Sequence, residues 1–286
     1  MRVDRMTDGY ETGDARRTGL LLGLLILGMV VAGGVGLTLY ARGRWWLPPL
    51  ASAEGAHIDR LFYSTLIITG IVFVLVHVLL ALFVWRFAAH GDRKARHWHD
   101  NRRLELTWTI IPAVALTVMV AMAGVVWART RLAPPATGMV VDVRAEQFAW
   151  LSRYPGPDGT FGRVDPTLIH PRTNRMGLDP KDPASADDIV SPELHLVVNE
   201  PVRVSLRSTG VIHAFFIPEF RVKQDAVPGV TIQTWFTPTR EGRYEIACAE
   251  LCGIGHYAMK GTVIVQSRDA FNAWLAQQTP ALTPAP

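Results

Sequence analysis

The sequence predicts a membrane-anchored α + β protein, with three N-terminal transmembrane helices followed by a β-sandwich outside the membrane. Hydrophobic residues make up 49% of the 286 residues. Three uncharged stretches each exceed the roughly 18 apolar residues that a membrane span requires. The rest of the chain is a series of short β-rich runs separated by Gly, Pro and Asp, which is typical of a sandwich.

The predicted spans are Thr18–Ala41, Leu61–Trp85 and Leu106–Ala128, the last two forming a helical hairpin over residues 61–128. Of the two connectors between the predicted spans, the one inside this hairpin is the more basic. It contains Arg86, Arg93, Lys94, Arg96, Arg102 and Arg103, whereas the first connector contains Arg42, Arg44 and Arg60. Because basic connectors stay in the cytoplasm, residues 1–17 are expected to be a cytoplasmic tail. The C-terminal domain then lies on the periplasmic face of the inner membrane.

The first span has a second interpretation. Arg16 and Arg17 precede an apolar run, as at the start of a secretory signal, and Ala51–Ala53 resembles a cleavage sequence. That sequence lies far beyond the apolar run, so we favour a retained helix over residues 18–41. Processing of this helix stays open.

Residues 137–267 are predicted to form the β-sandwich, and residues 268–286 a C-terminal amphipathic helix, over Arg268–Gln278, and a tail. The predicted strands are Met139–Trp150, Glu193–Asn199, Val202–Ser208, Ile212–Ile217, Val230–Phe236, Arg243–Ala247 and Gly261–Gln266. Residues 155–192 are rich in Pro, Asp and Gly and are expected to be a long surface excursion between strands.

The charge distribution follows the predicted topology. The formal net charge is +4, but the chain after Thr137 is slightly acidic, so the basic excess lies in the membrane half. The charge therefore gives no indication of nucleic-acid binding. A mildly acidic outer domain suits a basic protein partner, and ordinary solvated surface is the alternative explanation.

The segment C-A-E-L-C-G-I-G-H-Y-A-M contains the only two cysteines of the chain, Cys248 and Cys252, together with His256 and Met259. Thiolates and thioethers select Cu(I), and imidazole also suits copper. A second thiolate allows both sulfurs to bridge two copper ions, so that one electron shared over both metals changes each bond only slightly. The segment therefore predicts a copper electron-transfer site.

A dinuclear site needs a second imidazole, and His213 in the apolar run V-I-H-A-F-F-I-P is the natural donor. Each ligand also has a simpler interpretation. Cys248 and Cys252 could form a disulfide, His213 could be a hydrogen-bonded core histidine, and Met259 could fill the core.

The stretch Val211–Val265 closely resembles subunit II of haem–copper cytochrome c oxidases. The resemblance rests on F-R-V-K-Q-D-A-V-P-G (Phe220–Gly229), T-W-F (Thr234–Phe236) and the cysteine-containing segment. It implies a cupredoxin-like Greek-key domain that carries the dinuclear copper centre CuA. The ligands that it implies are Cys248 and Cys252 as bridging thiolates, His213 and His256 as imidazoles, Met259 as a weak axial ligand and Glu250 through its backbone carbonyl.

The resemblance also gives the Glu250 carboxylate to a magnesium or manganese ion shared with subunit I. Nitrous oxide reductase has a similar copper loop but typically has tryptophan at this position, so Glu250 favours the oxidase. Electrons would come from cytochrome c and pass to haem in subunit I, where oxygen is reduced and protons are pumped. Subunit III and membrane lipid are further expected partners, and no catalytic residue is expected in this chain. Because the chain has no C-x-x-C-H segment, the donor haem must be on another protein.

Three more residues enter through the resemblance. Glu105 matches a carboxylate at the entrance of a proton channel in subunit I, and a helix-start acid that favours the dipole is its alternative. Phe148 aligns with the tryptophan through which electrons enter in the family, and Trp150 is a second candidate; both could instead be sandwich core. Gly210 departs from the family, where an aspartate commonly stands shortly before the ligand histidine.

Three alternative functions come from other classes of protein, and the presence of the copper ligands argues against the first of them. A quinol-oxidising relative would lack the copper ligands. A nitric oxide reductase with a copper subunit would look the same in this chain. A copper-delivery or thiol–disulfide protein would use Cys248 and Cys252 without needing His213 or Met259.

Overall fold

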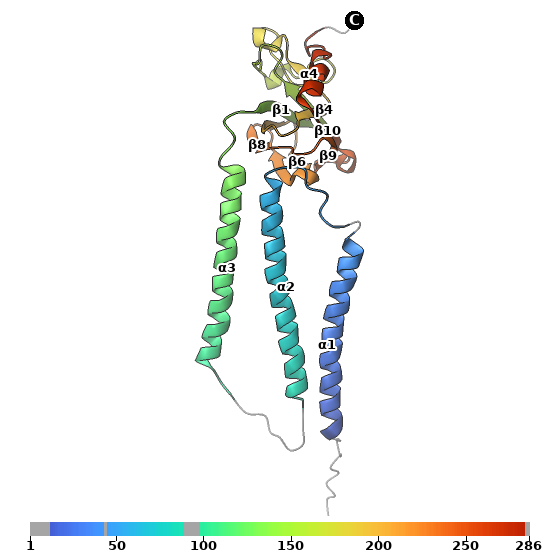
Figure 1. Cartoon of the computed structure of the whole chain (residues 1–286). Coiled ribbons are helices and arrows are strands. Elements are labelled where there is room, and N and C mark those ends of the chain that lie inside the picture. The colour runs from blue at the N-terminus through green and yellow to red at the C-terminus, as the bar shows by residue number, and fades with distance from the viewer. Residues whose placement is uncertain (1–11, 43–44, 89–97, 284–286) are drawn as a thin grey trace, which may run out of the picture. The chain divides into compact units, whose positions relative to one another are not determined.

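The computed structural model describes residues 12–42, 45–88 and 98–283. Residues 1–11 of the predicted tail, and Arg44, Arg93, Lys94 and Arg96 of the basic connectors, lie outside the described residues. The chain divides into two compact units, which are described separately (Figure 1). The first comprises the chain up to Trp46 together with Leu61–Ala121, and the second comprises Leu47–Arg60 together with the chain from Met122 onward.

Three long helices confirm the predicted spans. They are α1 (Thr12–Ala41), α2 (Gly55–Arg86) and α3 (Arg102–Arg131), each long and apolar enough to cross a membrane. In the first unit, α1 approaches α2 through two glycines. A Cβ atom would lie 2.8 Å from the carbonyl oxygen of Val84 if added at Gly19, and 2.9 Å from that of Ala81 if added at Gly23. Small residues at these positions therefore permit close backbone contact, as is common between membrane helices.

The second unit contains a sandwich of two five-stranded sheets. The first sheet has the order β3-β2-β1-β5-β8 and the second β4-β10-β9-β6-β7. The strands of the first are β3 (Ile189–Ser191), β2 (Ala149–Tyr154), β1 (Met139–Glu146), β5 (Val202–Ser208) and β8 (Ile232–Phe236). Those of the second are β4 (Glu193–Val197), β10 (Lys260–Gln266), β9 (Gly242–Cys248), β6 (His213–Ile217) and β7 (Val222–Ala226).

Alternate residues of the two sheets face each other and form the core. β1 and β5 run parallel, as do β4 and β10, and the other neighbours are antiparallel. The buried core side chains include Val141, Val143, Leu194, Leu196, Val204, Leu206, Phe215, Ile217, Phe236, Ile246 and Val263. The period of two in their burial is that of strands with one face on a core.

One predicted strand differs from the structure, and two further strands, β3 and β7, were not predicted. The run Met139–Trp150 is a hairpin, because β1 ends at Glu146 and β2 begins at Ala149, and no Gly or Pro marks the turn between them. The strand β3 has only three residues, too short for a pattern to predict. The strand β7 reads V-K-Q-D-A with polar residues outward, so it lacks the apolar run that indicated the other strands.

The C-terminal helix α4 (Arg268–Ala276) confirms the amphipathic prediction. The Ser267 side chain caps its start by accepting a hydrogen bond from the Ala270 amide. Phe271 is buried, and the Trp274 ring stacks on the His195 ring with centroids 3.7 Å apart. The helix thus covers one end of the sandwich.

The connector Leu47–Arg60 belongs to the sandwich unit. Ala51 and Ser52 are buried; the Ala51 amide donates to the Glu219 carbonyl (2.8 Å), and the Ser52 hydroxyl donates to the Phe220 carbonyl (2.7 Å). Farther along, Asp59 pairs with Arg221 at 2.7 Å. The sequence that resembles a cleavage site is therefore an ordered part of the folded domain.

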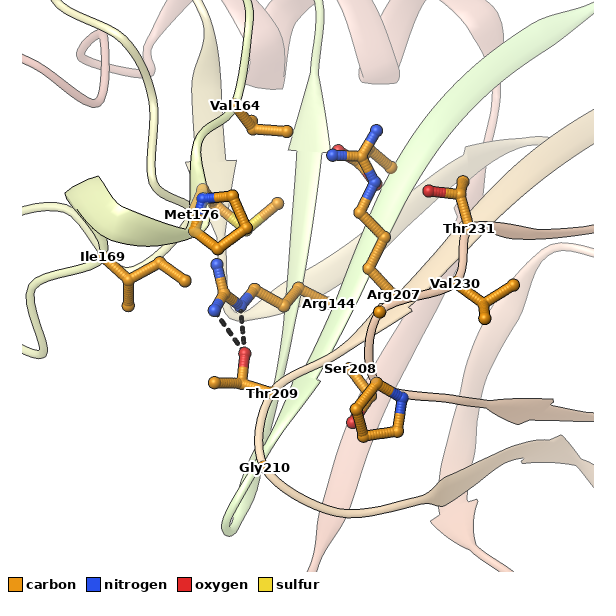
Figure 2. Close-up of a pocket in the computed structure, with 14 residues that line it drawn as sticks. Arg144, Val164, Ile169, Met176, Arg207, Ser208, Thr209, Gly210, Val230 and Thr231 are labelled. Carbon is orange, nitrogen blue, oxygen red and sulfur yellow. Dashed lines mark hydrogen bonds and ion pairs between the residues drawn. The ribbon is translucent and has the colours of Figure 1, made fainter.

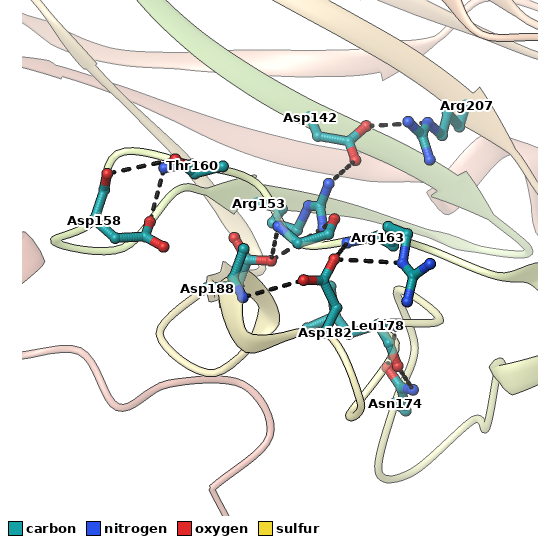
Figure 3. A network of polar contacts seen from close by, with 12 residues as sticks. Asp142, Arg153, Asp158, Thr160, Arg163, Asn174, Leu178, Asp182, Asp188 and Arg207 are labelled. Carbon is teal, nitrogen blue, oxygen red and sulfur yellow. Dashed lines mark hydrogen bonds and ion pairs between the residues drawn. The ribbon is translucent and has the colours of Figure 1, made fainter.

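The excursion between β2 and β3 is attached to the first sheet by a buried arginine (Figure 3). Arg153 is only 2% exposed and forms ion pairs of 3.1 Å with Asp142 of β1 and with Asp188 of the excursion. It also donates to the Gly162 carbonyl at 2.9 Å. The predicted surface excursion is therefore ordered, and it covers part of the polar outer face of the sheet.

Replacing Arg153 by Ala should lower the free energy of unfolding by about 3–5 kcal/mol, because Asp142 and Asp188 would stay buried without their shared cation. Arg163→Ala is the matched control: this excursion arginine is 73% exposed and pairs with Asp179 at the surface, so its loss should cost less than about 1 kcal/mol. Chemical denaturation of the full chain in detergent, followed by tryptophan fluorescence, measures both. Equal losses would contradict the anchoring role of Arg153.

Candidate metal centre

Two neighbouring strands of the second sheet bring the candidate ligands together. β6 begins with His213 and β9 ends with Cys248, and Phe215 pairs with Cys248 in the register of these strands. The loop after Cys248 returns to the sheet at Met259, where the Cys248 amide donates to the Met259 carbonyl at 3.2 Å. The ligands therefore lie at strand ends, and the loop is closed at its base.

The sulfur and nitrogen atoms form a compact cluster. The Sγ atoms of Cys248 and Cys252 are 3.7 Å apart. The Nδ1 atom of His213 lies 3.7 Å from Sγ of Cys248, and Nδ1 of His256 lies 3.6 Å from Sγ of Cys252. The Met259 Sδ atom is 3.8 Å from Sγ of Cys252. The structure thus brings together five candidate ligands that the sequence predicted.

The donor set fits a soft metal ion. Both cysteines are free thiols, and their Sγ separation exceeds the roughly 2.05 Å of a disulfide bond. Because metal–thiolate bonds are about 2.3 Å long, as for zinc, two sulfurs 3.7 Å apart can contact the same ion. Ligand atoms of His213, Cys248 and Cys252 all lie within 4.8 Å of one another. Among the described residues, Nε2 of His213 is buried without a hydrogen-bond partner.

Glu250 contacts the cluster through its main chain. Its backbone carbonyl lies 3.2 Å from Sγ of Cys248, and the residue itself is exposed. The main chain of Glu250 is therefore part of the cluster.

Burial shifts the pKa values of the clustered residues. Burial lowers the pKa of His213, with a smaller contribution from repulsion by His256, which favours the neutral imidazole that binds metals. Burial, followed by the neighbouring Cys248, raises the pKa of Cys252 to about 11. The thiol of Cys252 is therefore protonated at neutral pH when no metal is bound.

Phe148 and Trp150 occupy different positions beside the cluster. Trp150 is 2% exposed and its ring meets the His213 ring edge-on, with centroids 6.1 Å apart. Phe148 is 37% exposed and lies over Gly255 of the metal-binding loop. Of these two aromatic residues, only Phe148 both contacts the loop and is exposed to solvent.

Gln147 and Gly255 were not predicted from the sequence. The Gln147 side chain donates a hydrogen bond of 2.6 Å to the Cys252 carbonyl, which ties the loop to the end of β1. At Gly255, a Cβ atom would lie 2.4 Å from the Phe148 ring. In the sequence, the G-I-G pattern after Cys252 marks Gly255, but only the fold shows that the Phe148 ring leaves no room for a side chain there.

Three large side chains of the loop are highly exposed. Leu251 is 78%, Ile254 94% and Tyr257 84% exposed. We call these residues the loop-tip patch. Exposed apolar groups gathered at one place are typical of a protein contact.

Glu105 lies in the first turn of α3. Its carboxylate accepts a hydrogen bond of 3.4 Å from the Asn101 amide, and the Asn101 side chain accepts from the amides of Arg103 and Leu104. This reciprocal bonding at the helix start is similar to a capping box, with the acid four residues after the capping residue instead of three. The helix-start alternative to a proton-channel role therefore has direct contacts in its favour.

Comparison with known proteins agrees with these observations. The family "Cytochrome C oxidase subunit II, periplasmic domain" matches residues 183–267, and "Cytochrome C oxidase subunit II, transmembrane domain" matches residues 41–125. The alternative cytochrome c oxidase subunit 2 of Bradyrhizobium diazoefficiens is 39% identical over 256 residues, covering 89% of this chain and 91% of the relative. Cytochrome c oxidase subunit 2 of Cereibacter sphaeroides is 32% identical over 291 residues, covering 97% and 93%.

A solved structure is also similar in part. The periplasmic domain of subunit II of cytochrome oxidase (CoxB) of Bradyrhizobium japonicum is 29% identical, covers 50% of this chain and 95% of its own, and has a TM-score of 0.38.

The fold and the cluster define a membrane-anchored β-sandwich protein with a centre for a soft metal. The chain belongs to the cytochrome c oxidase subunit II family. It is a membrane protein whose C-terminal domain lies on the periplasmic side, as the basic connector predicted. Membership of this family implies copper of the CuA type.

The contact between Phe148 and Gly255 gives a prediction for the metal-free protein. Gly255→Ala should lower the free energy of unfolding by about 1–3 kcal/mol, because the added methyl group overlaps the Phe148 ring. Phe148→Ala in the same chain should remove most of this loss by vacating the space. A double-mutant cycle on the full chain in detergent measures the coupling, and strictly additive effects would show that the ring does not constrain the loop.

Proposed function

We propose that this chain is the electron-entry subunit of a respiratory cytochrome c oxidase and holds a dinuclear copper centre. The observation that carries the proposal is the clustering of two thiols, two imidazoles and one thioether within 3.8 Å contacts. A copper-delivery or thiol–disulfide protein would have no need for this complete set. The chain acts as part of an oxidoreductase, and the reaction with oxygen takes place in another subunit.

Each ligand has a proposed role. Cys248 and Cys252 would hold two copper ions through their thiolates, and His213 and His256 would hold them through their imidazoles. Met259 would contribute its thioether and Glu250 its backbone carbonyl. When bound, a copper pair shared by two thiolates would supply one-electron transfer with little change in bond lengths.

The surrounding residues keep the ligands in place with or without metal. Burial of His213, Cys252 and Met259 excludes water from the centre. The hydrogen bond from Gln147 to the Cys252 carbonyl restrains the loop. Ligands held in a fixed arrangement change little between oxidation states, which is the property that rapid electron transfer requires.

Electron entry is proposed at Phe148, with cytochrome c as the donor. The ring is the more exposed of the two aromatic candidates and covers the metal-binding loop. Trp150 is proposed to support the His213 ring from inside the core. The slightly acidic charge of the outer domain would favour encounter with a basic donor.

Subunit II of these oxidases assembles with subunit I, and the loop-tip patch supports a contact with that subunit. Leu251, Ile254 and Tyr257 would be covered there, next to the ligands from which electrons leave. The exposed carboxylate of Glu250 is proposed to bind a magnesium or manganese ion at the same border. Contact with subunit III is a further proposal and rests on the family alone.

A role for Glu105 at the entrance of a proton channel remains a proposal that requires subunit I. Its contact with Asn101 does not conflict with that role, because one carboxylate oxygen can cap the helix while the other faces a channel. The nitric oxide reductase alternative has no observation in its favour.

The proposal for the copper centre predicts an electron paramagnetic resonance spectrum. The full chain, purified in detergent and loaded with copper, should bind two copper ions and show the hyperfine pattern of one electron shared equally by two nuclei. Cys252→Ser removes one bridge and should abolish that pattern. Met259→Leu, which removes only the axial thioether, should keep it; a wild-type spectrum from a single copper nucleus would overturn the proposal.

The proposal for electron entry predicts different effects of substitutions at Phe148 and Trp150. Phe148→Ala should slow reduction of the copper centre by cytochrome c roughly tenfold in the assembled oxidase, as expected when one aromatic contact worth about 1.4 kcal/mol is lost. The buried control Trp150→Phe should leave the bimolecular rate close to that of the wild type. Stopped-flow absorbance measures both, and the reverse result would assign entry to Trp150.

A further inference from the structure

A cavity of about 390 Å³ lies on the outer side of the first sheet (Figure 2). Its floor is formed by side chains of β1 and β5, and its walls come from the excursion, the β5–β6 loop and the β7–β8 loop. The charged lining residues are Asp142, Arg144 and Arg207. The cavity therefore lies where the excursion and two loops leave part of the polar sheet face uncovered.

Arg144 forms the floor and has no carboxylate of its own. It is 7% exposed, and within the described part of the chain its guanidinium donates hydrogen bonds only to the Thr209 hydroxyl. The nearby carboxylate of Glu146 is held by Arg175. A buried guanidinium whose only hydrogen-bond acceptor is neutral has no bonded negative charge to compensate its own.

Arg207 lies on the wall and is more exposed than Arg144, with 36% of its side chain open to solvent. Its Nε atom is buried and has no hydrogen bond among the described residues, and its nearest acid is Asp142 at 3.6 Å. The same aspartate is bound more closely by Arg153, at 3.1 Å. The single aspartate of the lining is thus shared, and two arginines beside the cavity lack a full partner.

The other walls are largely apolar. They include Val164, Pro166, Ile169, Met176, Pro228 and Val230. The volume falls near the lower end of the roughly 300–1,000 Å³ that small-molecule sites span. A fully hydrated dianion would leave these apolar walls without contacts, whereas a compact aliphatic group would fill them.

We propose that this cavity binds a small monocarboxylate with an apolar body. The carboxylate takes hydrogen bonds from Arg144 and Arg207, and the aliphatic part packs between the excursion and the β7–β8 loop. Arginine suits this role because its planar guanidinium matches a carboxylate. The bound anion supplies the negative charge that Arg144 lacks.

Isothermal titration calorimetry of the full chain in detergent tests the proposal. The probes are 3-methylbutanoate, its neutral amide 3-methylbutanamide, and inorganic phosphate, at constant ionic strength. The carboxylate should bind one site per chain with a dissociation constant on the order of 1 mM or lower. The amide has the same shape without the charge and should not bind measurably.

Three variants assign the binding to the cavity. Arg144→Gln should weaken binding by about tenfold or more, because it removes the charge but keeps a hydrogen-bond donor. Val230→Trp is a steric block at a half-exposed position of the wall, and it should abolish binding without touching either arginine. Arg243→Gln is the matched control, since this exposed arginine pairs with Glu193 on the other sheet and should leave binding unchanged.

The proposal is overturned if the carboxylate does not bind, if the amide binds equally well, or if binding persists in both Arg144→Gln and Val230→Trp. Tighter binding of phosphate than of the carboxylate would overturn the assigned ligand class. Thermal unfolding of each variant verifies that it is folded.

Discussion

The register between β6 and β9 is the constraint on which the candidate metal centre depends. Phe215 pairs with Cys248, and His213 lies two residues before Phe215 on the same face of its strand. A slip by one residue would turn His213 to the opposite face and separate its imidazole from the thiols. The register is held because the alternate residues Phe215 and Ile217 fill the core. The strand register that packs the sandwich core is therefore the same register that brings His213 to the thiols.

The loop that carries the remaining ligands is held by contacts at both of its sides. At the base, the Cys248 amide bonds to the Met259 carbonyl; at the flank, Gln147 bonds to the Cys252 carbonyl and Phe148 covers Gly255. The contacts at the flank come from the hairpin of β1 and β2, which belongs to the other sheet. Both sheets thus contribute to a centre whose ligands all come from one of them.

The outer face of the first sheet serves a different purpose. Asp142, Arg144, Arg153 and Arg207 lie there, in a layer that the excursion largely covers. Arg153 forms ion pairs with two aspartates and fixes the excursion, whereas Arg144 and Arg207 border the cavity. The same polar layer therefore contains an arginine that anchors the excursion, Arg153, and a buried arginine without a bonded carboxylate among the described residues, Arg144. Pairing distinguishes the two buried arginines: Arg153 contacts two carboxylates, whereas among the described residues the guanidinium of Arg144 donates hydrogen bonds only to the Thr209 hydroxyl.

The sequence by itself determined the three spans, the orientation in the membrane, the sandwich and the candidate ligands. Hydropathy, the basic connector and the soft donors of the cysteine segment depend on residue type and local spacing, which the chain displays directly. Only the tertiary structure decided that Phe148 is exposed and Trp150 is buried, that residues 51–52 belong to the sandwich, and that Arg153 is an internal ion-pair partner. These properties arise from contacts between segments far apart in the chain, and no local pattern specifies which neighbour a side chain will meet.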